Sequence, residues 1–336
     1  MTSVFNHTTK RWLGLFLLFN LLFILFISSI KFGEYSTQWK DILYAFTHFD
    51  YSNEHVIIRD VRFPRALIAI CIGANLGIAG ALLQSLTRNP LADTGILGIN
   101  GGASLLVVLA VTLFSISSLN QFTWIAFLGA AIFGTIVYAL GQTTKGDHSP
   151  IRLTLAGAAV AAFTTSLSHA FLIINASALD EVLFWISGSI AGRNMAMLIE
   201  IFPYMLIGWI GSILIAKKID ALQLGEDVAK SLGQNTVWVK LTMGLLIIIL
   251  AGSSVAIAGP ISFVGLIIPH MARFFVGLNS RWVIIYSGLL GASLLLLADM
   301  ISRLIAMPQE VPVGVTTAII GVPFFIYIVR KGRMQS

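Results

Sequence analysis

Residues 217–236, KKIDALQLGEDVAKSLGQNT, form the most sustained polar stretch in the second half of a chain that otherwise alternates long apolar runs with very short breaks. Asp220 followed by Gln223 is typical of a capping box, and Gly233 after Lys230 is typical of a helix stop. The pattern predicts one helix of about three turns between them. Because both flanks are apolar, the stretch separates two predicted membrane spans and organises the rest of the fold around it.

The predicted helix carries one small apolar face. Positions at i, i+3, i+4 and i+7 are Gly225, Val228, Ala229 and Leu232, while Glu226, Asp227 and Lys230 lie off that face. Two interpretations are open. The helix either lies on lipid headgroups as a solvated loop, or docks into a groove on a soluble partner and moves with it.

The composition indicates a polytopic membrane protein. Of the 336 residues, 57% are hydrophobic and 11% are charged, whereas soluble domains carry about 25% charged residues. At roughly 20 residues per span, the apolar runs predict an all-α fold of about ten transmembrane helices, a single transmembrane domain over residues 1–336 in the cytoplasmic membrane. The predicted spans are 12–30, 64–84, 97–116, 122–141, 151–173, 196–216, 237–256, 258–277, 282–304 and 313–330.

Charge sets the predicted orientation. With the N-terminus inside, 14 of the 21 Lys and Arg residues fall on the cytoplasmic side and 7 outside, as the positive-inside rule requires. The cytoplasmic segments are then 85–96, 142–150, 217–236, 278–281 and the C-terminal tail. An outer loop is expected at 31–61 and a short outer helix at 176–193. The net charge of +6 is attributed to topology and headgroups, so no nucleic-acid partner is expected.

The chain lacks the sequence features of an ATP site or of bond chemistry. No GxxxxGK[ST] phosphate loop occurs, the single cysteine Cys71 lies in an apolar run, and the six histidines have no ligand spacing. We therefore expect no catalytic site, metal site or cofactor. Most ionisable residues fall at span ends, with His169 as the deepest exception, and a lone histidine is more often a packed residue than a proton relay. Energy for uphill transport would then come from a partner.

An ordered set of short motifs covers most of the chain. They are Arg62-Phe-Pro-Arg65, Arg88-Asn-Pro-Leu-Ala92 with Gly101-Gly102-Ala103, Trp185-x-x-Gly188-Ser189, Leu224-Gly225 with Leu232-Gly233, Gly259-Pro260 through Pro269-His270-x-x-Arg273, Ala298-Asp299-x-x-x-Arg303 and Gly321-Val-Pro323. Together they resemble the permease subunits of ABC importers for ferric siderophores, haem and cobalamin. Thr94 departs from the family pattern, which usually has proline there.

The resemblance implies a permease that transports a ferric siderophore and is not itself an enzyme. Its partners would be a second permease, identical or related, two cytoplasmic ATPases that bind the ATP, and an extracytoplasmic siderophore-binding protein. Haem or cobalamin is the nearest alternative cargo, and an ion-coupled secondary transporter is the alternative of another class. Residues 217–236 would be the ATPase-coupling segment. Its expected contact residues are Leu224, Gly225, Glu226, Ala229, Leu232 and Gly233.

At the outer face, Pro64 predicts a helix that begins between Arg62 and Arg65, so that both arginines point toward water. The resemblance implies that these two residues and Arg303 hold acidic residues of the binding protein, because guanidinium groups bind carboxylates in bidentate fashion. Anchoring at the lipid interface, or pairing with Asp60, is the other interpretation.

The resemblance also implies that span 151–173 lines the central path. Its weakly polar wall would consist of Thr164, Thr165, Ser168 and His169. Tight packing through small residues is the alternative for this span. Residues 176–193 are either an outer gate, formed by Trp185, Gly188 and Ser189, or an aromatic interfacial anchor.

Overall fold

The computed structural model describes residues 4–5, 8–33, 35, 37–116, 118–142, 150–174, 182–183, 185–307 and 309–333. Every regular element within these residues is helical, which confirms the all-α fold. The elements are α1 Thr8–Lys31, α2 Trp39–Thr47, α3 Asn53–Val56, η1 Ile57–Arg62, α4 Phe63–Thr87, η2 Thr94–Leu97, α5 Ile99–Phe114, α6 Leu119–Gln142, α7 Pro150–Ile174, α9 Met195–Gln223, α10 Glu226–Ser231, α11 Thr236–Ala258, α12 Val264–Val276, α13 Ser280–Ile305 and α14 Val313–Arg333.

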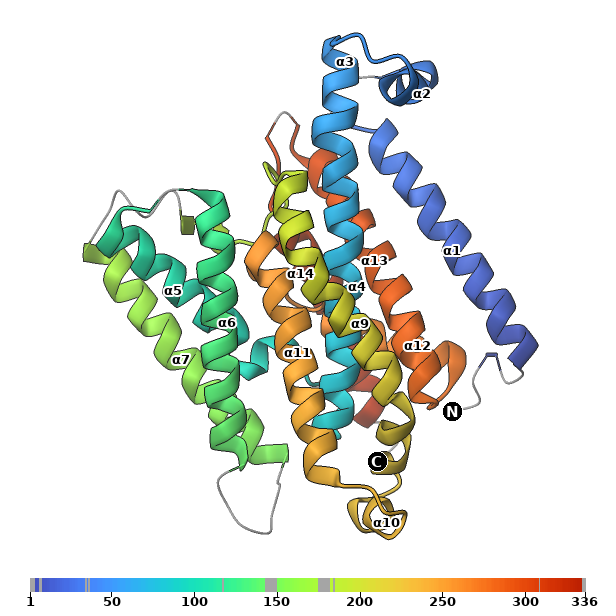
Figure 1. The fold of residues 1–336 in the computed structure, drawn as a ribbon, viewed down its shortest axis with the longest axis vertical. Helices are drawn as coiled ribbons and strands as arrows, with labels where there is room; N and C mark the ends of the chain where they lie inside the picture. The colour runs from blue at the N-terminus through green and yellow to red at the C-terminus, as the bar shows by residue number, and fades with distance from the viewer. Residues whose placement is uncertain are drawn as a thin grey trace.

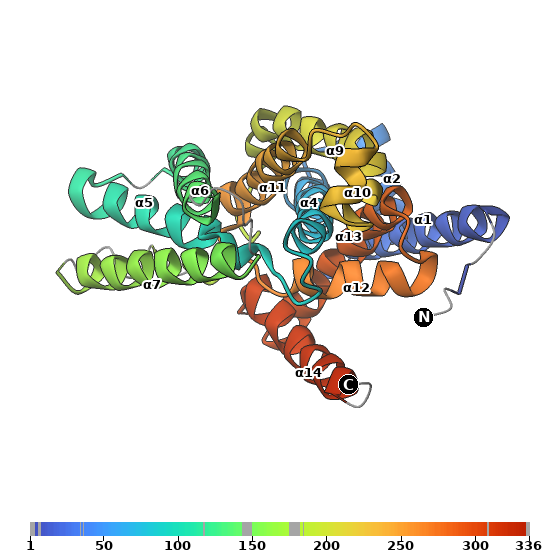
Figure 2. The same cartoon turned by 90° about the horizontal axis from the view of Figure 1, so that it is seen from below.

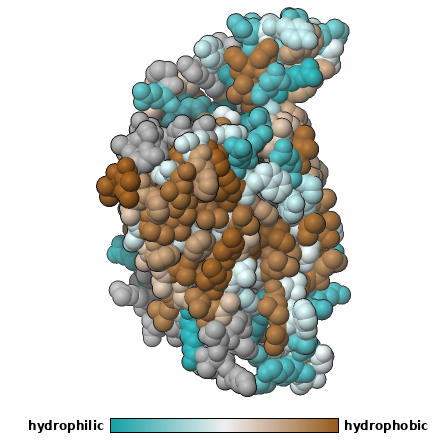
Figure 3. Space-filling view, turned by 60° about the vertical axis from the view of Figure 1, so that its left-hand side comes forward, coloured by the Kyte–Doolittle hydropathy of each residue, from teal (hydrophilic) through white to brown (hydrophobic). Residues whose placement is uncertain are grey.

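Seven of the described helices are long and apolar enough to cross a membrane. Three shorter apolar helices, Ile99–Phe114, Val264–Val276 and Val313–Tyr327, coincide with the remaining predicted spans. Figure 3 shows the corresponding surface, with hydrophobic residues in a band across the middle and hydrophilic residues toward both ends. The chain is therefore a multi-pass membrane protein.

Helix α4 stands at the centre of the bundle (Figures 1 and 2) because its glycines let neighbouring helices approach closely. A Cβ atom on Gly73 would lie 2.3 Å from the carbonyl oxygen of Gly291 in α13, and one on Gly77 would lie 2.2 Å from that of Ser287. No real Cβ atom fits at such distances. We call these four residues the glycine seam, and it joins α4 and α13 backbone to backbone.

Helices α5, α6 and α7 form a lobe to one side of α4 (Figure 2). Helix α11 connects the lobe to the core, because it packs against both α4 and α6. Glycine again permits the close contacts within the lobe, since a Cβ on Gly129 of α6 would lie 2.5 Å from the carbonyl oxygen of Gly102 in α5.

The outer segment 31–61 is largely helical instead of a plain loop. Helix α3, the π-helical turn η1 and α4 form one helical run over Asn53–Thr87. At 1.5 Å per residue it is about 50 Å long, longer than the roughly 30 Å hydrocarbon core of a bilayer. The α-helix α4 begins at Phe63, between Arg62 and Arg65 as predicted, but the chain before it is already helical. The wide turn η1, in which the N–H of Phe63 bonds to the carbonyl of Ile58, carries the helix past Pro64.

Candidate functional site

The polar stretch 217–236, which we call the coupling segment, is organised differently from its prediction. Helix α9 continues through Gln223, and α10 spans only Glu226–Ser231. Gly225, with a φ of +132°, separates the two helices. The predicted capping box is wrong, because its two side chains bind neighbouring helices: Asp220 Oδ1 accepts the backbone N–H of Ser280 at 2.8 Å.

The coupling segment presents an apolar tip. Its side chains Leu224, Val228 and Leu232 are 71%, 44% and 67% exposed. Ala229, which the sequence placed on the same face, is fully buried, so it supports the helix from inside and cannot touch a partner directly. Gly233 is exposed and adopts a φ of +78°. The apolar tip is therefore the part of this segment that is available to a partner protein.

Glu226 fastens α10 to α11 and does not belong to the tip. Its Oε2 lies 2.7 Å from Lys240 Nζ, and its Oε1 accepts a hydrogen bond from the Thr236 hydroxyl at 3.2 Å. Lys230 lies 3.7 Å away on the next turn. Burial raises the pKa of Glu226, but the hydrogen bond and charge of Lys240, aided by Thr236 and Lys230, outweigh burial and hold this pKa below its ordinary value.

The lowered pKa of Glu226 predicts how α10 responds to pH. A carboxylate with a depressed pKa contributes stability above its ordinary pKa of 4.5 and loses it as the pH falls through the lowered value. We expect a spin label at Ser231→Cys to show equal mobility at pH 8 and pH 6, and higher mobility only in acid. Glu226→Gln should raise mobility already at pH 7, while Asp227→Asn should not. Rising mobility between pH 8 and 6 would contradict this assignment.

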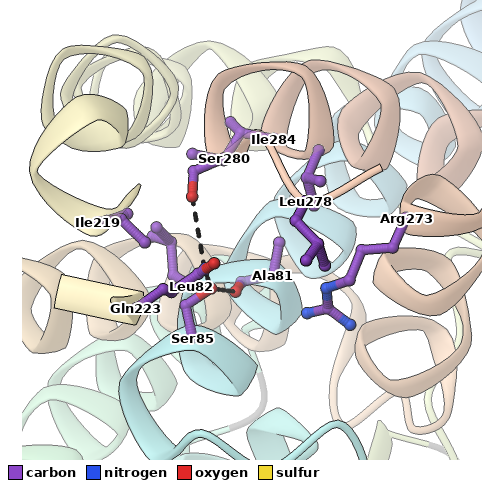
Figure 4. Close-up of a pocket in the computed structure, with 10 residues that line it drawn as sticks. Ala81, Leu82, Ser85, Ile219, Gln223, Arg273, Leu278, Ser280 and Ile284 are labelled. Carbon is purple, nitrogen blue, oxygen red and sulfur yellow. Dashed lines mark hydrogen bonds between the residues drawn. The ribbon is translucent and has the colours of Figure 1, made fainter. Parts of the chain in front are cut away.

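Side chains of three helices anchor the coupling segment to the bundle. Gln223 Nε2 donates to Ser85 Oγ of α4 at 3.1 Å and to Ser280 Oγ of α13 at 3.5 Å (Figure 4). Arg88, which follows α4, donates to the carbonyl of Leu222 at 3.0 Å. The same junction encloses a cavity of about 10 Å³, on the order of the space one water needs. Helix α10 packs against the end of α9, so a movement of α10 reaches α4 and α13 through that end.

The three outer arginines are buried, so the expectation that Arg62 and Arg65 point toward water is wrong. Arg62, Arg65 and Arg303 are 5%, 7% and 7% exposed. Arg62 donates to the carbonyl oxygens of Ile30 and Lys31 at 3.0 and 3.1 Å. Its guanidinium thus holds the end of α1 against the helical run that contains α4. A role of these arginines in docking stays a prediction.

Arg65 and Arg303 share one fully buried carboxylate, that of Asp299. Arg65 Nε and Nη2 donate to Asp299 Oδ1 at 3.0 and 2.8 Å. Arg303 Nη2 lies 3.1 Å from Oδ2 as an ion pair without hydrogen-bond geometry. Arg65 Nη1 also donates to both carboxylate oxygens of Glu310 at 2.8 Å. We call Arg65, Asp299, Arg303 and Glu310 the outer ion cluster. It joins α4, α13 and the segment before α14.

The four residues predicted to line the central path fall on two faces of α7. Thr164 and Ser168 are buried, and each donates its hydroxyl to a carbonyl one turn earlier. Thr164 packs against α5, where a Cβ on Gly101 would lie 2.3 Å from its Oγ1. Thr165 and His169 are exposed. Only this second pair can face a path outside the chain.

The predicted outer-gate residues form a packed junction. Trp185 and Ser189 are 1% and 3% exposed. The backbone N–H of Ser189 donates to the carbonyl of Ala258 at 2.8 Å, and that of Gly314 donates to the carbonyl of Gly188 at 2.9 Å. The junction therefore links the end of α11 to the start of α14. Residues 176–181 and 184 of the predicted outer helix lie outside the described residues.

The sequence did not indicate two carboxylates, Glu310 and Asp93, that contact residues far away in the chain. Glu310 accepts hydrogen bonds from Arg65, which lies 245 positions earlier in the chain. Asp93, from the loop after α4, lies beside the start of α12, because a Cβ on Gly265 would lie 2.9 Å from its Oδ1. Such a carboxylate is favourable at the positive end of a helix dipole. No local pattern at either position indicates a partner so far away in sequence.

Comparisons with known proteins agree with this architecture. The model of the FecCD transport family matches residues 21–331. The Bacillus subtilis protein named "Probable siderophore transport system permease protein YfiZ" is 50% identical over 97% of this chain and 98% of its own length. The ferric enterobactin transport system permease protein FepD of Escherichia coli is 41% identical over 93% of each chain. A solved inward-facing structure of a protein described as a metal-chelate type ABC transporter superposes with a TM-score of 0.84 at 30% identity, covering 94% of this chain and 98% of that one.

Proposed function

The chain belongs to the FecCD transport family, and from this membership we propose that it is the permease subunit of a binding-protein-dependent ABC importer for a ferric siderophore. It crosses the cytoplasmic membrane ten times, with seven long and three shorter apolar helices and both termini in the cytoplasm. A second permease, two ATPases and an extracytoplasmic binding protein complete the importer. ATP is bound and hydrolysed by the ATPases, and this chain performs no bond chemistry.

The observation that carries the proposal is the coupling segment. Its exposed apolar tip lies on and beside the short helix α10, and its base is fastened to α4, α11 and α13. An apolar surface of this kind suits a groove on a soluble partner. The hydrogen bonds to α4, α11 and α13 then transmit a movement of the partner to the core of the bundle. A solvated loop helix would need neither feature.

At the outer face, the proposal gives the ion cluster a role in docking the binding protein. Glu310, whose side chain is 37% exposed, is the accessible member. A carboxylate on the binding protein would compete with Glu310 for Nη1 of Arg65, because Asp299 already occupies Nε and Nη2. On α7, the exposed residues Thr165 and His169 would border a central path that the second permease completes.

Iron uptake by cells that lack this gene tests the proposal. Radiolabelled iron is supplied on hydroxamate, catecholate and carboxylate siderophores, with haem and labelled cobalamin in parallel. We expect uptake of one siderophore class to fall to background and to return when the intact gene is restored. A ferric siderophore is favoured over haem and cobalamin because the named relatives above are siderophore and ferric enterobactin permeases.

Two results would contradict the proposal. Loss of haem or cobalamin uptake alone would show that the importer carries that compound and not a ferric siderophore. Transport by the purified chain alone in liposomes, driven by an ion gradient, would show that the chain is a secondary carrier and not part of an ABC importer. Uptake of an amino acid through an unrelated carrier serves as the control for cell viability.

A further inference from the structure

A groove of about 610 Å³ opens beside the coupling segment, between the inner ends of α9 and α11. Helix α9 contributes Gly211, Leu214 and Lys218, helix α11 contributes Trp238 and Thr242, and residues 232–235 form the floor. The volume lies within the roughly 300–1,000 Å³ that ligand sites occupy. Leu232 and Gly233 belong to the coupling segment, whereas the walls that α9 and α11 contribute have no role in the function proposed above.

Close packing higher in the two helices explains why the groove is confined to their inner ends. A Cβ on Gly208 would lie 2.4 Å from Leu250 Cδ2, and one on Gly211 would lie 2.6 Å from Leu246 Cδ2. The helices are therefore in full contact at these levels. Toward the inner side α10 and residues 232–235 connect them, and this inserted segment keeps the helix ends apart.

The groove faces lipid along most of its length. Leu214 and Trp238 are 76% and 68% exposed, and their neighbours Ile210 and Leu245 are 50% and 57% exposed. All four lie on membrane-spanning helices, so the medium that contacts them is hydrocarbon and the adjoining interface. An acyl chain is the ligand that such a wall accepts.

The inner end of the groove is cationic. Lys218 is exposed, and it forms no ion pair within the part of the chain that the structure describes. Trp238 is the aromatic residue beside it, and indole groups prefer the headgroup level of a membrane. The Gln234 side chain donates to the backbone carbonyl of Lys218 at 3.0 Å, which fixes the lysine relative to the floor.

We propose that this groove binds an anionic phospholipid, with an acyl chain along Leu214 and Trp238 and the phosphate at the ammonium group of Lys218. Basic pockets between helices on the cytoplasmic side are suited to anionic headgroups. The cytoplasmic placement rests on the proposed function. Because the Gln234 side chain bonds to the backbone of Lys218, the bound headgroup lies next to the residues that connect α10 to α11.

Lipid retention by the full chain, purified with its partner subunits, tests the site. Native mass spectrometry counts the retained dioleoylphosphatidylglycerol and dioleoylphosphatidylcholine, which have the same acyl chains. Lys218→Gln should reduce retained phosphatidylglycerol about fivefold, the factor that corresponds to about 1 kcal/mol per basic residue near the surface. The matched control Lys217→Gln, an exposed lysine that does not line the groove, should leave retention unchanged. Leu214→Trp should reduce retention by filling the groove.

Several outcomes would overturn the site. Equal loss of phosphatidylglycerol in both lysine variants would show general charge attraction. Equal retention of phosphatidylglycerol and phosphatidylcholine would show that the groove does not select the headgroup. Unchanged phosphatidylglycerol retention in Lys218→Gln would exclude Lys218 from the site. Cross-linking of Leu214→Cys to a partner subunit would show that protein fills the groove.

Thiol labelling at Gln234→Cys separates this proposal from the proposed function. The native Cys71 is buried, so the introduced thiol is the reactive one. Labelling from the cytoplasmic side together with unchanged lipid retention in Lys218→Gln overturns the lipid site alone. Labelling from the outer side overturns the orientation on which the proposed function rests.

Discussion

Replacing Asp299 by alanine should lower the free energy of unfolding by about 3–5 kcal/mol, the cost of removing one partner from a buried ion pair. The Asp299 side chain is fully buried, and Arg65 and Arg303 both bind it. Without it, two guanidinium groups that are almost fully buried lose their shared counter-charge. Thermal unfolding of the purified protein in detergent should show a melting temperature lower by several degrees.

Two variants serve as controls for Asp299→Ala. Asp227→Ala removes an exposed carboxylate from α10 and should leave the melting temperature unchanged. Glu310→Gln removes a partly exposed partner of Arg65 and should cost about 1 kcal/mol or less, because solvent replaces much of the interaction. A melting temperature for Asp299→Ala equal to that of Asp227→Ala would mean that the outer ion cluster does not stabilise the fold.

Leu232→Asp should abolish uptake while the protein stays in the membrane. The leucine is 67% exposed at the apolar tip, and the proposal places it inside the ATPase groove. Full burial of a leucine side chain is worth about 1.5–3 kcal/mol, and a loss of about 2 kcal/mol corresponds to roughly 30-fold weaker binding. The ATPase should no longer co-purify with the variant, and radiolabelled iron uptake should fall to background.

Leu278→Asp is the matched control for Leu232→Asp. Leu278 is 74% exposed in the loop between α12 and α13, outside the coupling segment. The same substitution there should leave co-purification and uptake close to the unchanged protein. Normal uptake by Leu232→Asp would remove the tip from the coupling mechanism, and equal loss in both variants would extend the docking surface beyond the coupling segment.

The sequence predicted the membrane helices well because apolar length is a local property. The sequence did not predict the environment of the outer arginines. Asp299 and Glu310, the carboxylates that pair with Arg65, follow it by 234 and 245 positions. Nor did the sequence predict that α9 continues through Asp220, because the Asp220 carboxylate accepts the backbone N–H of Ser280 at the start of α13 and does not cap a helix that begins at Asp220. Thr164 and Thr165 were grouped together, although adjacent helical residues point to different faces.

The position of the coupling segment was predicted, but its geometry was not. Composition alone marked residues 217–236 as polar between apolar runs. The burial of Ala229 and the inward turn of Glu226 depend on where α11 begins and on the position of Lys240. Both features depend on tertiary contacts, which the helical periodicity of a short stretch does not predict.

The glycine seam between α4 and α13 limits how evolution can vary this chain. An added carbon at Gly73 or Gly77 has no space, since the neighbouring backbone already occupies it. Substitutions at the seam should therefore push α4 and α13 apart, whereas positions without such contact can vary without that cost. Thr165 and His169, on the exposed face of α7, are free to change without disturbing the core. The chain thus combines a seam that has no space for an added carbon with an exposed face that has such space.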